Sequence, residues 1–315
     1  MLLKEISYYR TGGSFDTIVK PASTAELSEA MADIESRNTP YFLLGAGSNS
    51  LVMDDHWPGT VIVFSEMQGL SVDGDCVVAQ AGVDNTQFAE FCLEHSLSGA
   101  SWMNWLPGRL GSTVRMNARC YGGEMSQIVE SLSSVSPSGQ IKTIEGSDAL
   151  LGYKETCFMN NDEAISEIRF KLSAGDRSQI RRHMDFCRTD REKKQQFLYP
   201  SCGCVFKNDY TVGIPSGLLL DKAGVRKLSS ERVEISPYHA NFLFNKGATS
   251  RELLQTALDM RDLTYDVFGV WLEFELEILG VIPDDLQQRL NLQEPPRYSE
   301  EELKPLRKQF QQKLS

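Results

Sequence analysis

The stretch from Tyr41 to Val52 constrains the fold more than any other part of the chain. Its first four residues are apolar and predict a buried strand, which runs directly into Gly45-Ala46-Gly47-Ser48-Asn49-Ser50. Two glycines one residue apart allow positive φ angles and a close approach of a ligand to the backbone. Successive N–H groups in such a turn form a nest for an anion. The segment therefore predicts a phosphate-binding turn, with a tight strand-to-strand turn as the alternative.

Residues 13 to 66 predict one compact α/β unit around this turn. Phe15 to Val19 is an apolar strand, a helix capped by Ser23 or Thr24 follows, and Gly59 to Phe64 is a further strand. The dinucleotide fingerprint G-x-G-x-x-G is not met, because Ser50 stands where the third glycine belongs. A second apolar run follows the turn in place of a helix.

The composition predicts a soluble globular protein with reduced thiols. The net charge is −11, which disfavours non-specific nucleic-acid binding, since that binding needs clustered Lys and Arg. No apolar run is long enough for a signal peptide or a membrane span. Seven cysteines and four histidines are scattered without metal-type spacing, so we expect no metal site. These features indicate a cytoplasmic protein.

Residues 67 to about 172 predict a second unit that is rich in strands. We expect one helix, from Asn85 to His95, and strands at Gly69–Val72, Cys76–Ala81, Glu130–Val135, Gln140–Ile144 and Ala164–Leu172. Between them, Trp102 to Gly123 contains too many glycines for a regular helix. This segment predicts either a backbone that wraps a large flat ligand or an irregular buried loop packed by two tryptophans.

The remainder predicts a charged helix and a third unit. Residues 173 to 194 are interpreted as a solvated linker helix. The third unit starts near Phe197, and its final strand, Trp271 to Gly280, alternates so that three glutamates share one face. Its other predicted elements are a turn into a short strand at Ser201–Asn208, a helix at Ser216–Ala223 ended by Gly224, a strand at His239–Asn245, a helix at Arg251–Phe268 and a polar helix at Ser299–Leu314.

Seven blocks in a fixed order, from roughly Thr11 to Gly280, resemble those of the UDP-N-acetylenolpyruvoylglucosamine reductase (MurB) family. They are Gly45-Ala-Gly-Ser-Asn-Ser-Leu-Val52, Pro107-Gly-x-x-Gly-x-x-Val-Arg-Met-Asn-Ala-x-x-Tyr-Gly-Gly-Glu124, Tyr153-Lys-x-x-x-Phe158, Ser201-Cys-Gly-Cys-Val-Phe-Lys-Asn208, Ala223-Gly224, His239-Ala-Asn-Phe242 and Phe274-Glu275-Leu-x-Ile-x-Gly280. Seven blocks in family order are far more specific than any one of them.

The resemblance implies an α+β fold with an FAD-binding region of the vanillyl-alcohol-oxidase type. Two α/β units would bind FAD: residues 1–66, completed by the returning strand at 269–280, and residues 67–193. Residues 194–268 would form a smaller α+β substrate-binding domain. Residues 281–315, a C-terminal helical extension, lie outside the resemblance, which does not give the oligomeric state.

The resemblance also implies a reaction in peptidoglycan synthesis. NADPH would give a hydride to FAD, and the flavin would pass it to the enolpyruvyl β-carbon of a UDP-sugar. The resulting enolate would then be protonated at the α-carbon by a positioned acid. Cationic or hydrogen-bonding groups must stabilise the developing negative charge. The alternative is a non-enzymatic or altered-substrate homologue that binds flavin or a nucleotide sugar.

The site residues carried over from the family fall into three groups. The expected cofactor contacts are Gly45, Ala46, Gly47, Ser48, Asn49, Ser50, Pro107, Gly108, Gly111, Ser112 and Asn117. The expected catalytic residues are Cys204, where the family usually has serine, Glu275, and Lys154, where the family has arginine. Tyr153, Lys154, Lys207 and Asn208 are expected to bind substrate. A thiol remains a usable acid, and lysine keeps the charge but loses the bidentate fork.

Each assignment has a structural alternative. Cys204 would otherwise be a small buried hydrophobe, Glu275 a surface carboxylate, and Lys154 an exposed lysine. In addition, Arg109, Ser112, Thr113 and Arg119 are larger than the residues the family usually has near the flavin. They would either crowd the flavin or add contacts to phosphates, and the first outcome would favour the non-enzymatic hypothesis.

Overall fold

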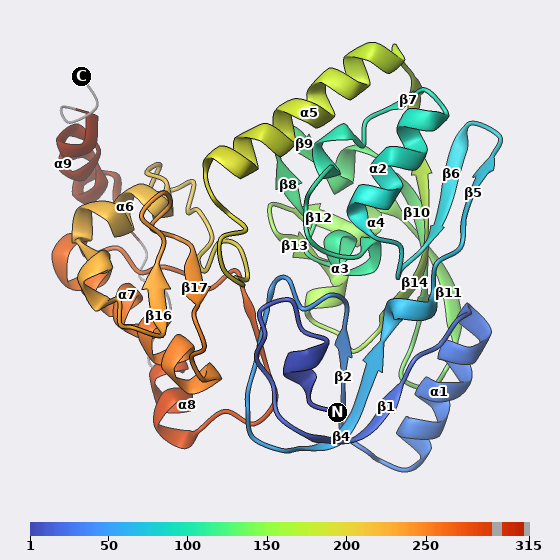
Figure 1. The fold of residues 1–315 in the computed structure, drawn as a ribbon, viewed down its shortest axis with the longest axis horizontal. Coiled ribbons are helices and arrows are strands. Elements are labelled where there is room, and N and C mark those ends of the chain that lie inside the picture. Colours follow the sequence, from blue (N-terminus) through green and yellow to red (C-terminus); the bar gives the residue numbers. More distant parts are fainter. Residues whose placement is uncertain (292–297, 312–315) are drawn as a thin grey trace. The chain divides into compact units, whose positions relative to one another are not determined.

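The computed structural model describes residues 1–291 and 298–311. The chain divides into two compact units (Figure 1). Unit 1 comprises Met1–Ser14, Gly47–His56 and the chain from Lys194 onward, and unit 2 comprises Phe15–Ala46 and Trp57–Lys193. The chain therefore passes from one unit to the other four times. The predicted division into three parts, with boundaries at 66, 193 and 268, remains a prediction.

Unit 2 contains a three-stranded parallel sheet. Its order is β1 (Phe15–Val19), β4 (Trp57–Val63) and β2 (Tyr41–Leu44), and both outer strands run parallel to β4. Helix α1 (Thr24–Ser36) links β1 to β2 and begins where the Ser23 side chain accepts a hydrogen bond from the Glu26 N–H. The predicted strands and the cap at Ser23 are confirmed. The buried strand before the glycine-rich turn is β2.

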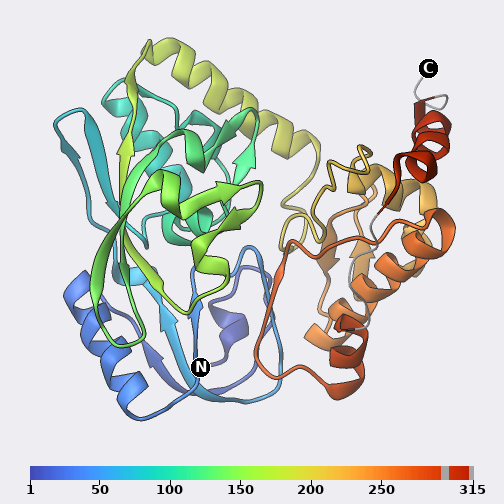
Figure 2. The ribbon, with the colours of Figure 1, turned by 180° about the vertical axis from the view of Figure 1, so that it is seen from behind.

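The second sheet of unit 2 is antiparallel and has five strands. Their order is β11 (Ile141–Glu145), β10 (Val129–Val135), β14 (Ala164–Lys171), β6 (Cys76–Gln80) and β5 (Leu70–Asp73). Figure 2 shows the long hairpin of β5 and β6 at the edge of this sheet. Gly74 has a φ of 64° in its turn, as a two-residue hairpin requires. All five predicted strands are confirmed within one or two residues.

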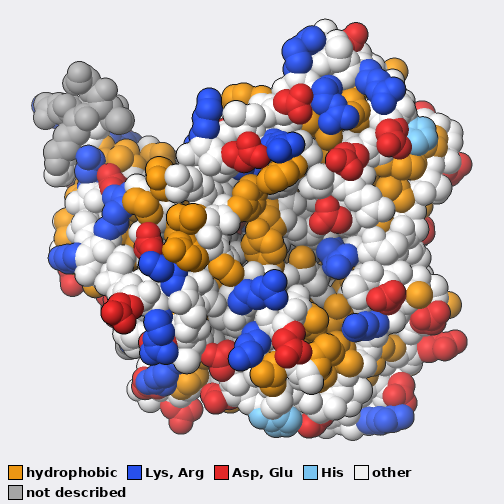
Figure 3. All heavy atoms as spheres, viewed as in Figure 1, with side chains coloured by type: hydrophobic (Ala, Val, Ile, Leu, Met, Phe, Trp, Pro, Cys, Tyr) orange, Lys and Arg blue, Asp and Glu red, His pale blue; other side chains and the backbone are white. Residues whose placement is uncertain are grey.

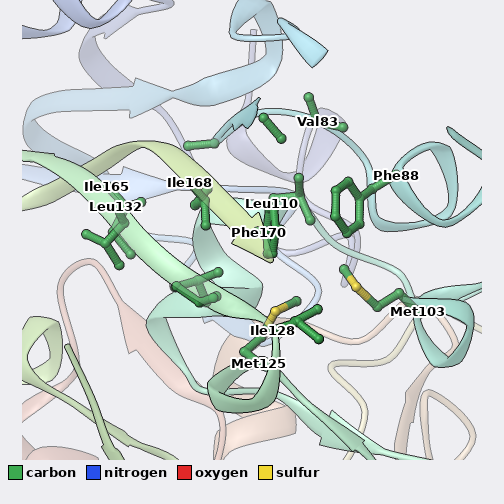
Figure 4. Packing of buried hydrophobic residues seen from close by; sticks show 14 of the residues in the cluster. Val83, Phe88, Met103, Leu110, Met125, Ile128, Leu132, Ile165, Ile168 and Phe170 are labelled. Atoms are coloured by element: carbon green, nitrogen blue, oxygen red, sulfur yellow. The ribbon is translucent and has the colours of Figure 1, made fainter. Parts of the chain in front are cut away.

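Helices cover this sheet and enclose the core of unit 2. They are α2 (Asn85–Glu94), α3 (Leu110–Arg115), α4 (Gly146–Ala149) and α5 (Arg177–Lys193). Figure 4 shows Phe88 of α2 and Leu110 of α3 packed over Phe170 and Ile168 of β14. The Phe88 and Phe170 ring centroids lie 4.4 Å apart. Burial of these side chains fixes α3, and with it the glycine-rich segment before it, on the sheet.

Helix α5 corrects the interpretation of residues 173–194 as a solvated linker. Ile180, Met184, Cys187 and Arg191 recur at helical spacing and are buried. The helix therefore packs this face against the rest of unit 2, where it contacts α2 and β7 (Leu97–Ser98), and most of its charged residues are exposed. The charge count alone concealed this narrow apolar stripe.

Short elements complete unit 2. Three two-stranded pairs are β7 (Leu97–Ser98) with β15 (Ser173–Ala174), β8 (Arg119–Cys120) with β9 (Gly123–Glu124), and β12 (Leu150–Gly152) with β13 (Glu155–Thr156). Single 3₁₀ turns lie at Phe64–Glu66, Ser101–Met103, Met125–Gln127 and Cys157–Met159. The β8–β9 and β12–β13 hairpins carry two of the blocks shared with the family.

Unit 1 is built around helix α7 (Ser250–Phe268). Thr249 forms a capping box with Glu252 at its start, and Gly269 ends it with a φ of 66°. The other helices are α6 (Ser216–Ala223), α8 (Asp284–Leu290) and α9 (Glu300–Gln311), with 3₁₀ turns at Leu3–Glu5 and Val225–Leu228. Strand β16 (Val233–Ile235) pairs with β17 (Leu243–Asn245), and β3 (Ser50–Val52) runs parallel to β18 (Glu277–Leu279). The last strand therefore pairs with the strand that directly follows the glycine-rich turn.

Two predicted strands of unit 1 are shorter than expected. Residues 239–242 form a turn, closed by a bond from the Phe242 N–H to the His239 carbonyl (2.9 Å), so only 243–245 form a strand. Residues 271–276 make isolated contacts before β18 begins at Glu277. Alternating apolar residues predicted continuous strands, but irregular pairing partners interrupt both ladders. Helix α8 was not predicted, and residues 312–314 of the predicted polar helix lie outside the described residues.

Charged side chains of both signs are intermingled on the face of the molecule shown in Figure 3. Within each unit many are paired, as with Arg169 beside Asp73 and Glu130 in unit 2, and Arg251 beside Asp285 in unit 1. In the described parts of the chain, no helix has the length and apolar character that crossing a membrane requires. All seven cysteines are free thiols.

Candidate active site

The glycine-rich turn joins the two units, with Gly45 and Ala46 in unit 2 and Gly47 to Ser50 in unit 1. A Cβ added at Gly45 would lie 2.6 Å from Ser112 Oγ, so this backbone packs directly on α3. Gly47 has a φ of 67°, and a Cβ there would lie 2.9 Å from Ser7 Oγ. Close packing therefore requires a glycine at position 45, and the positive φ of the turn favours one at position 47. These features fit the predicted nest, and the anion itself remains a prediction.

The segment from Pro107 to Asn117 contains α3, which the glycine count had argued against. Gly108 has a φ of 143°. The first two N–H groups of α3 donate to carbonyls just after β6: Leu110 N–H to Val83 O (2.9 Å) and Gly111 N–H to Ala81 O (2.8 Å). A Cβ at Gly111 would lie 2.7 Å from Ala81 Cβ. The glycines thus permit close contact between a short helix and the sheet, which helical propensity alone does not predict.

Only one of the two tryptophans expected to pack this segment is buried. Trp102 is 2% exposed, and the glycine at position 123 lies against its indole. Trp105 is 37% exposed and lies beneath the Arg188 guanidinium, whose central carbon is 4.6 Å from the ring centroid. The alternative of a loop packed by two tryptophans is therefore wrong for Trp105.

Asn117 anchors the family block that follows α3. Its Nδ2 donates to Glu124 Oε1 (3.0 Å) and to Gly152 O (2.8 Å), and its Oδ1 accepts from the Ser126 N–H (3.1 Å). Both amide hydrogens are therefore used within the protein. The bond to Gly152 holds the turn that carries Tyr153 and Lys154, so this residue supports the site through its neighbours.

Lys154 lies in the turn of the β12–β13 hairpin and is 8% exposed. The alternative of a solvent-exposed lysine is wrong. Its φ of 54° is unusual for a residue with a side chain, so the turn holds the lysine in a specific orientation. Burial raises the pKa of the Cys120 thiol, while the charges of Arg191 and Lys154 act in the opposite direction. A cation with so little access to water is suited to binding an anionic group.

Four residues are larger here than is usual in the family: Arg109, Ser112, Thr113 and Arg119. Their polar groups contact other residues of unit 2. Arg109 Nη1 donates to Gly82 O (2.5 Å), and Thr113 Oγ1 donates to Asn85 Oδ1 (3.0 Å). Ser112 Oγ donates to Arg109 O (2.9 Å), and the Arg119 guanidinium lies over the Tyr153 ring at 5.6 Å. Arg109 Nε is buried and has no hydrogen-bond partner among residues 1–291 and 298–311. It is a buried donor available in this segment.

In unit 1, the segments that carry Cys204 and Glu275 pair with one another. The Glu275 N–H donates to Val205 O (2.8 Å), and the Lys207 N–H donates to Glu273 O (2.9 Å). The Phe206 and Phe274 rings pack with their centroids 4.9 Å apart. Pairing in this register brings two residues that lie 71 positions apart in the sequence onto neighbouring backbone segments.

Asn49 connects the glycine-rich turn to the segment of Glu275. Its Nδ2 donates to Glu275 O (3.0 Å), and its backbone carbonyl accepts from the Glu277 N–H (2.9 Å). Cofactor binding was the role expected of Asn49. That role remains a prediction. The structure shows that Asn49 fixes the backbone around a predicted catalytic carboxylate, a role for which the sequence contains no local signal.

The remaining predicted residues lie near the start of α6. Lys207 forms an ion pair with Glu273, and Asn208 Oδ1 accepts from the Ser216 N–H (2.9 Å). Cys204 is partly exposed, whereas Cys202 is 2% exposed and burial raises its pKa strongly. Cys202 is therefore the buried small hydrophobe of the pair, and that alternative does not describe Cys204. Among described residues, no group of three or more His, Cys, Asp and Glu is placed to hold a metal.

Comparisons with known proteins agree with this geometry. Residues 15–145 match the model of an FAD binding domain, and residues 194–279 match the UDP-N-acetylenolpyruvoylglucosamine reductase, C-terminal domain. A UDP-N-acetylenolpyruvoylglucosamine reductase of Streptococcus pneumoniae strain Hungary19A-6 is 34% identical over 285 residues, covering 88% of this chain and 92% of that protein. The protein of that name from strain ATCC 700669 is also 34% identical, covering 88% of each chain.

A crystal structure gives the same result. The UDP-N-acetylenolpyruvylglucosamine reductase (MurB) of Thermus caldophilus aligns with a TM-score of 0.74 and 27% identity, over 89% of this chain and 97% of that one. The matches cover both units, and the resemblance implied by the seven sequence blocks is confirmed. The chain belongs to the UDP-N-acetylenolpyruvoylglucosamine reductase family.

Proposed function

We propose that this protein uses FAD and NADPH to reduce UDP-N-acetylglucosamine enolpyruvate to UDP-N-acetylmuramate. This activity would serve peptidoglycan synthesis, and through it cell shape and cell division, in the cytoplasm. Family membership supports the reaction class. The observation that carries the proposal for this chain is the pairing of the segments that contain Cys204 and Glu275, in which the Glu275 N–H donates to the carbonyl of Val205, the residue after Cys204.

The residues of unit 2 fit the cofactor. Gly45 and Gly111 are positions where a Cβ would approach other atoms within 3 Å, so the backbone forms a closely packed support. The Arg109 Nε, buried without a hydrogen-bond partner, adds a donor. We expect the turn at 45–50 and the segment at 107–112 to hold FAD. Bound FAD would accept a hydride from NADPH and deliver it to the enolpyruvyl β-carbon.

The chain's own residues would manage the charge and the proton. Negative charge develops on the substrate carboxylate and enolate, and the buried Lys154 is the cation assigned to stabilise it. The partly exposed Cys204 would give its proton to the α-carbon, with Glu275 assisting. Tyr153, Lys207 and Asn208 would hold the UDP-sugar.

Cys204→Ala tests the proposal by separating the two half-reactions. We expect flavin bleaching by NADPH under anaerobic conditions to proceed at nearly the wild-type rate, and protonated product to be lost. Cys204→Ser should restore part of the second half-reaction, because a hydroxyl can also donate a proton. Cys202→Ala is the matched control, since it removes a neighbouring thiol that is buried. Survival of both half-reactions in Cys204→Ala would show that the assigned acid is wrong.

The non-enzymatic alternative makes a different prediction for the purified protein. If the larger residues around Arg109 and Thr113 excluded the cofactor, no flavin spectrum would appear even after FAD is added. The Arg109 and Thr113 side chains form hydrogen bonds to Gly82 and Asn85 within unit 2. Because these bonds hold both side chains within the protein, they favour retention of the cofactor. A flavin spectrum that bleaches with NADPH is therefore the expected result.

A further inference from the structure

A turn in unit 1 prevents continuous strand pairing beside Cys204. The Phe242 N–H bonds to His239 O, and the Asn241 N–H bonds to His239 Nδ1 (3.3 Å). Strand β17 therefore begins only at Leu243. Because residues 239–242 curl back on themselves, their backbone supplies too few groups to pair with each peptide of the adjacent segment, residues 204–206.

Asn241 supplies the missing groups with its side chain. Its Oδ1 accepts from the Phe206 N–H (2.9 Å), and its Nδ2 donates to Phe206 O (2.8 Å). Its backbone carbonyl accepts from the Val205 N–H (2.9 Å). A carboxamide has the same donor and acceptor as a peptide group, so this side chain replaces one residue of a strand partner. Asn241 is 2% exposed, so water cannot take over these bonds.

These three bonds fix the two residues that follow Cys204. Before Cys204, Gly203 has a φ of 77°, and a Cβ added there would meet nothing within 4 Å. Gly203 therefore makes no close contact in the direction of a Cβ, and its positive φ sets the turn that leads into Cys204. On the other edge, Val205 O accepts from the Glu275 N–H. Residues 205 and 206 are thus held between Asn241 and the segment that carries Glu275.

We infer that Asn241 is a positioning residue, which holds the Cys204 thiol in register with Glu275 for proton transfer. The inference rests on the proposed function, because it assigns Asn241 a role only through Cys204. Misplacement of a reacting group by about 1 Å costs on the order of 10²-fold in rate. Loss of the clamp should therefore slow protonation of the substrate far more than it weakens substrate binding.

Asn241→Ala is compared with Asn245→Ala as a matched control. Asn245 is also a buried asparagine of unit 1. Its Nδ2 donates to Tyr9 O (2.9 Å) and to Arg10 O (3.5 Å), and its Oδ1 accepts from the Gly247 and Ala248 N–H groups (2.9 and 2.8 Å). Asn241→Ala removes two buried side-chain hydrogen bonds and Asn245→Ala removes four, so the control should lose at least as much stability in urea unfolding. We expect only Asn241→Ala to slow the substrate half-reaction, by about 10- to 100-fold. Flavin reduction by NADPH and substrate affinity should change less than about 3-fold.

Asn241→Asp adds a readout that lost stability alone would not produce. An ionised carboxylate still accepts from the Phe206 N–H but repels Phe206 O, whereas a protonated carboxyl group can again donate to it. The substrate half-reaction of this variant, relative to wild type, should therefore recover as the pH is lowered. This measurement also serves if Asn241→Ala does not fold.

Double variants separate failure of this inference from failure of the proposed function. If Asn241 acts through Cys204, adding Asn241→Ala to Cys204→Ala should cause no further loss in the substrate half-reaction. Equal slowing by the Asn241 and Asn245 variants, or no recovery of Asn241→Asp at low pH, would overturn the positioning role. If Cys204→Ala alone leaves the half-reaction intact, the proposed function of Cys204 fails instead.

Discussion

Gly45→Ala should destabilise unit 2 and weaken flavin binding through one contact. The new methyl group would lie 2.6 Å from Ser112 Oγ and 3.0 Å from Ser112 Cβ, so one of the two must move. Ser112 cannot rotate without losing its bond to Arg109 O (2.9 Å). Gly45 has no positive φ, so alanine itself is tolerated by the backbone. Overpacking of this kind costs about 1–3 kcal/mol in the free energy of unfolding.

The effect is measured by urea unfolding of the flavin-free protein and by titration with FAD. Ser112→Gly removes both clashing atoms, at a cost of up to about 1 kcal/mol for glycine within a helix. The double variant Gly45→Ala, Ser112→Gly should therefore be about as stable as Ser112→Gly alone. Gly152→Ala is the control, because its added Cβ would meet only the flexible Glu155 side chain, at 3.3 Å.

Two results would refute this reasoning. If Gly45→Ala were as stable as wild type, the close packing of the turn on α3 would not exist as described. If Ser112→Gly failed to rescue Gly45→Ala, the cost would lie elsewhere than in this contact. Loss of FAD affinity in Gly152→Ala to the same degree would indicate that any added methyl group disturbs the unit.

Three further predictions concern other parts of the site. Asn117→Ala should lower the free energy of unfolding by about 2–4 kcal/mol, because the partly buried Ser126 N–H, Gly152 carbonyl and Glu124 carboxylate would lose their partner. Urea unfolding tests this, and a loss below about 0.5 kcal/mol would contradict the anchor role. Lys154→Arg should preserve or strengthen binding of the enolpyruvyl substrate in calorimetry, because the charge is kept and a bidentate fork is gained; a large loss would contradict its assignment to the carboxylate. His239→Gln should reduce the loss of stability on acidification. Burial lowers the pKa of His239 in the folded protein. As the pH falls through about 6.5, the unfolded state therefore takes up a proton first, and the free energy of unfolding decreases. Equal slopes of the free energy of unfolding against pH for the variant and the wild type would refute this.

The sequence predicted the sheets of unit 2 well, because each strand there has a regular partner. The apolar residues of β10 and β14 and the glycine in the β5–β6 turn, Gly74, are local signals, and the observed bounds lie close to those predicted. Prediction was weaker in unit 1. Residues 239–242 and 271–276 have strand-like patterns, but a turn and a side-chain clamp take the place of ladder bonds there, and neither has a periodic signature.

The site was predicted through family blocks rather than through periodicity, and the blocks do not describe how side chains are supported. Lys154 is buried in a left-handed turn, which its charge alone does not suggest. Asn49 and Asn241 occupy family blocks, yet their bonds to Glu275 O and to Phe206 join residues 226 and 35 positions apart. Such contacts depend on the complete fold, so local sequence reasoning could not find them.

The order in which the chain enters the two units bears on its synthesis. Every residue of unit 2 precedes Lys194, so this unit can finish folding while the C-terminal third is still being translated. Unit 1 cannot. Strand β3, made early, must wait for β18, whose pairing residues lie 227 positions later. During this interval the apolar side chains of Leu51 and Met53, which belong to the core of unit 1, lack the partners that bury them. The nascent chain should therefore need protection from aggregation until residue 279 has left the ribosome.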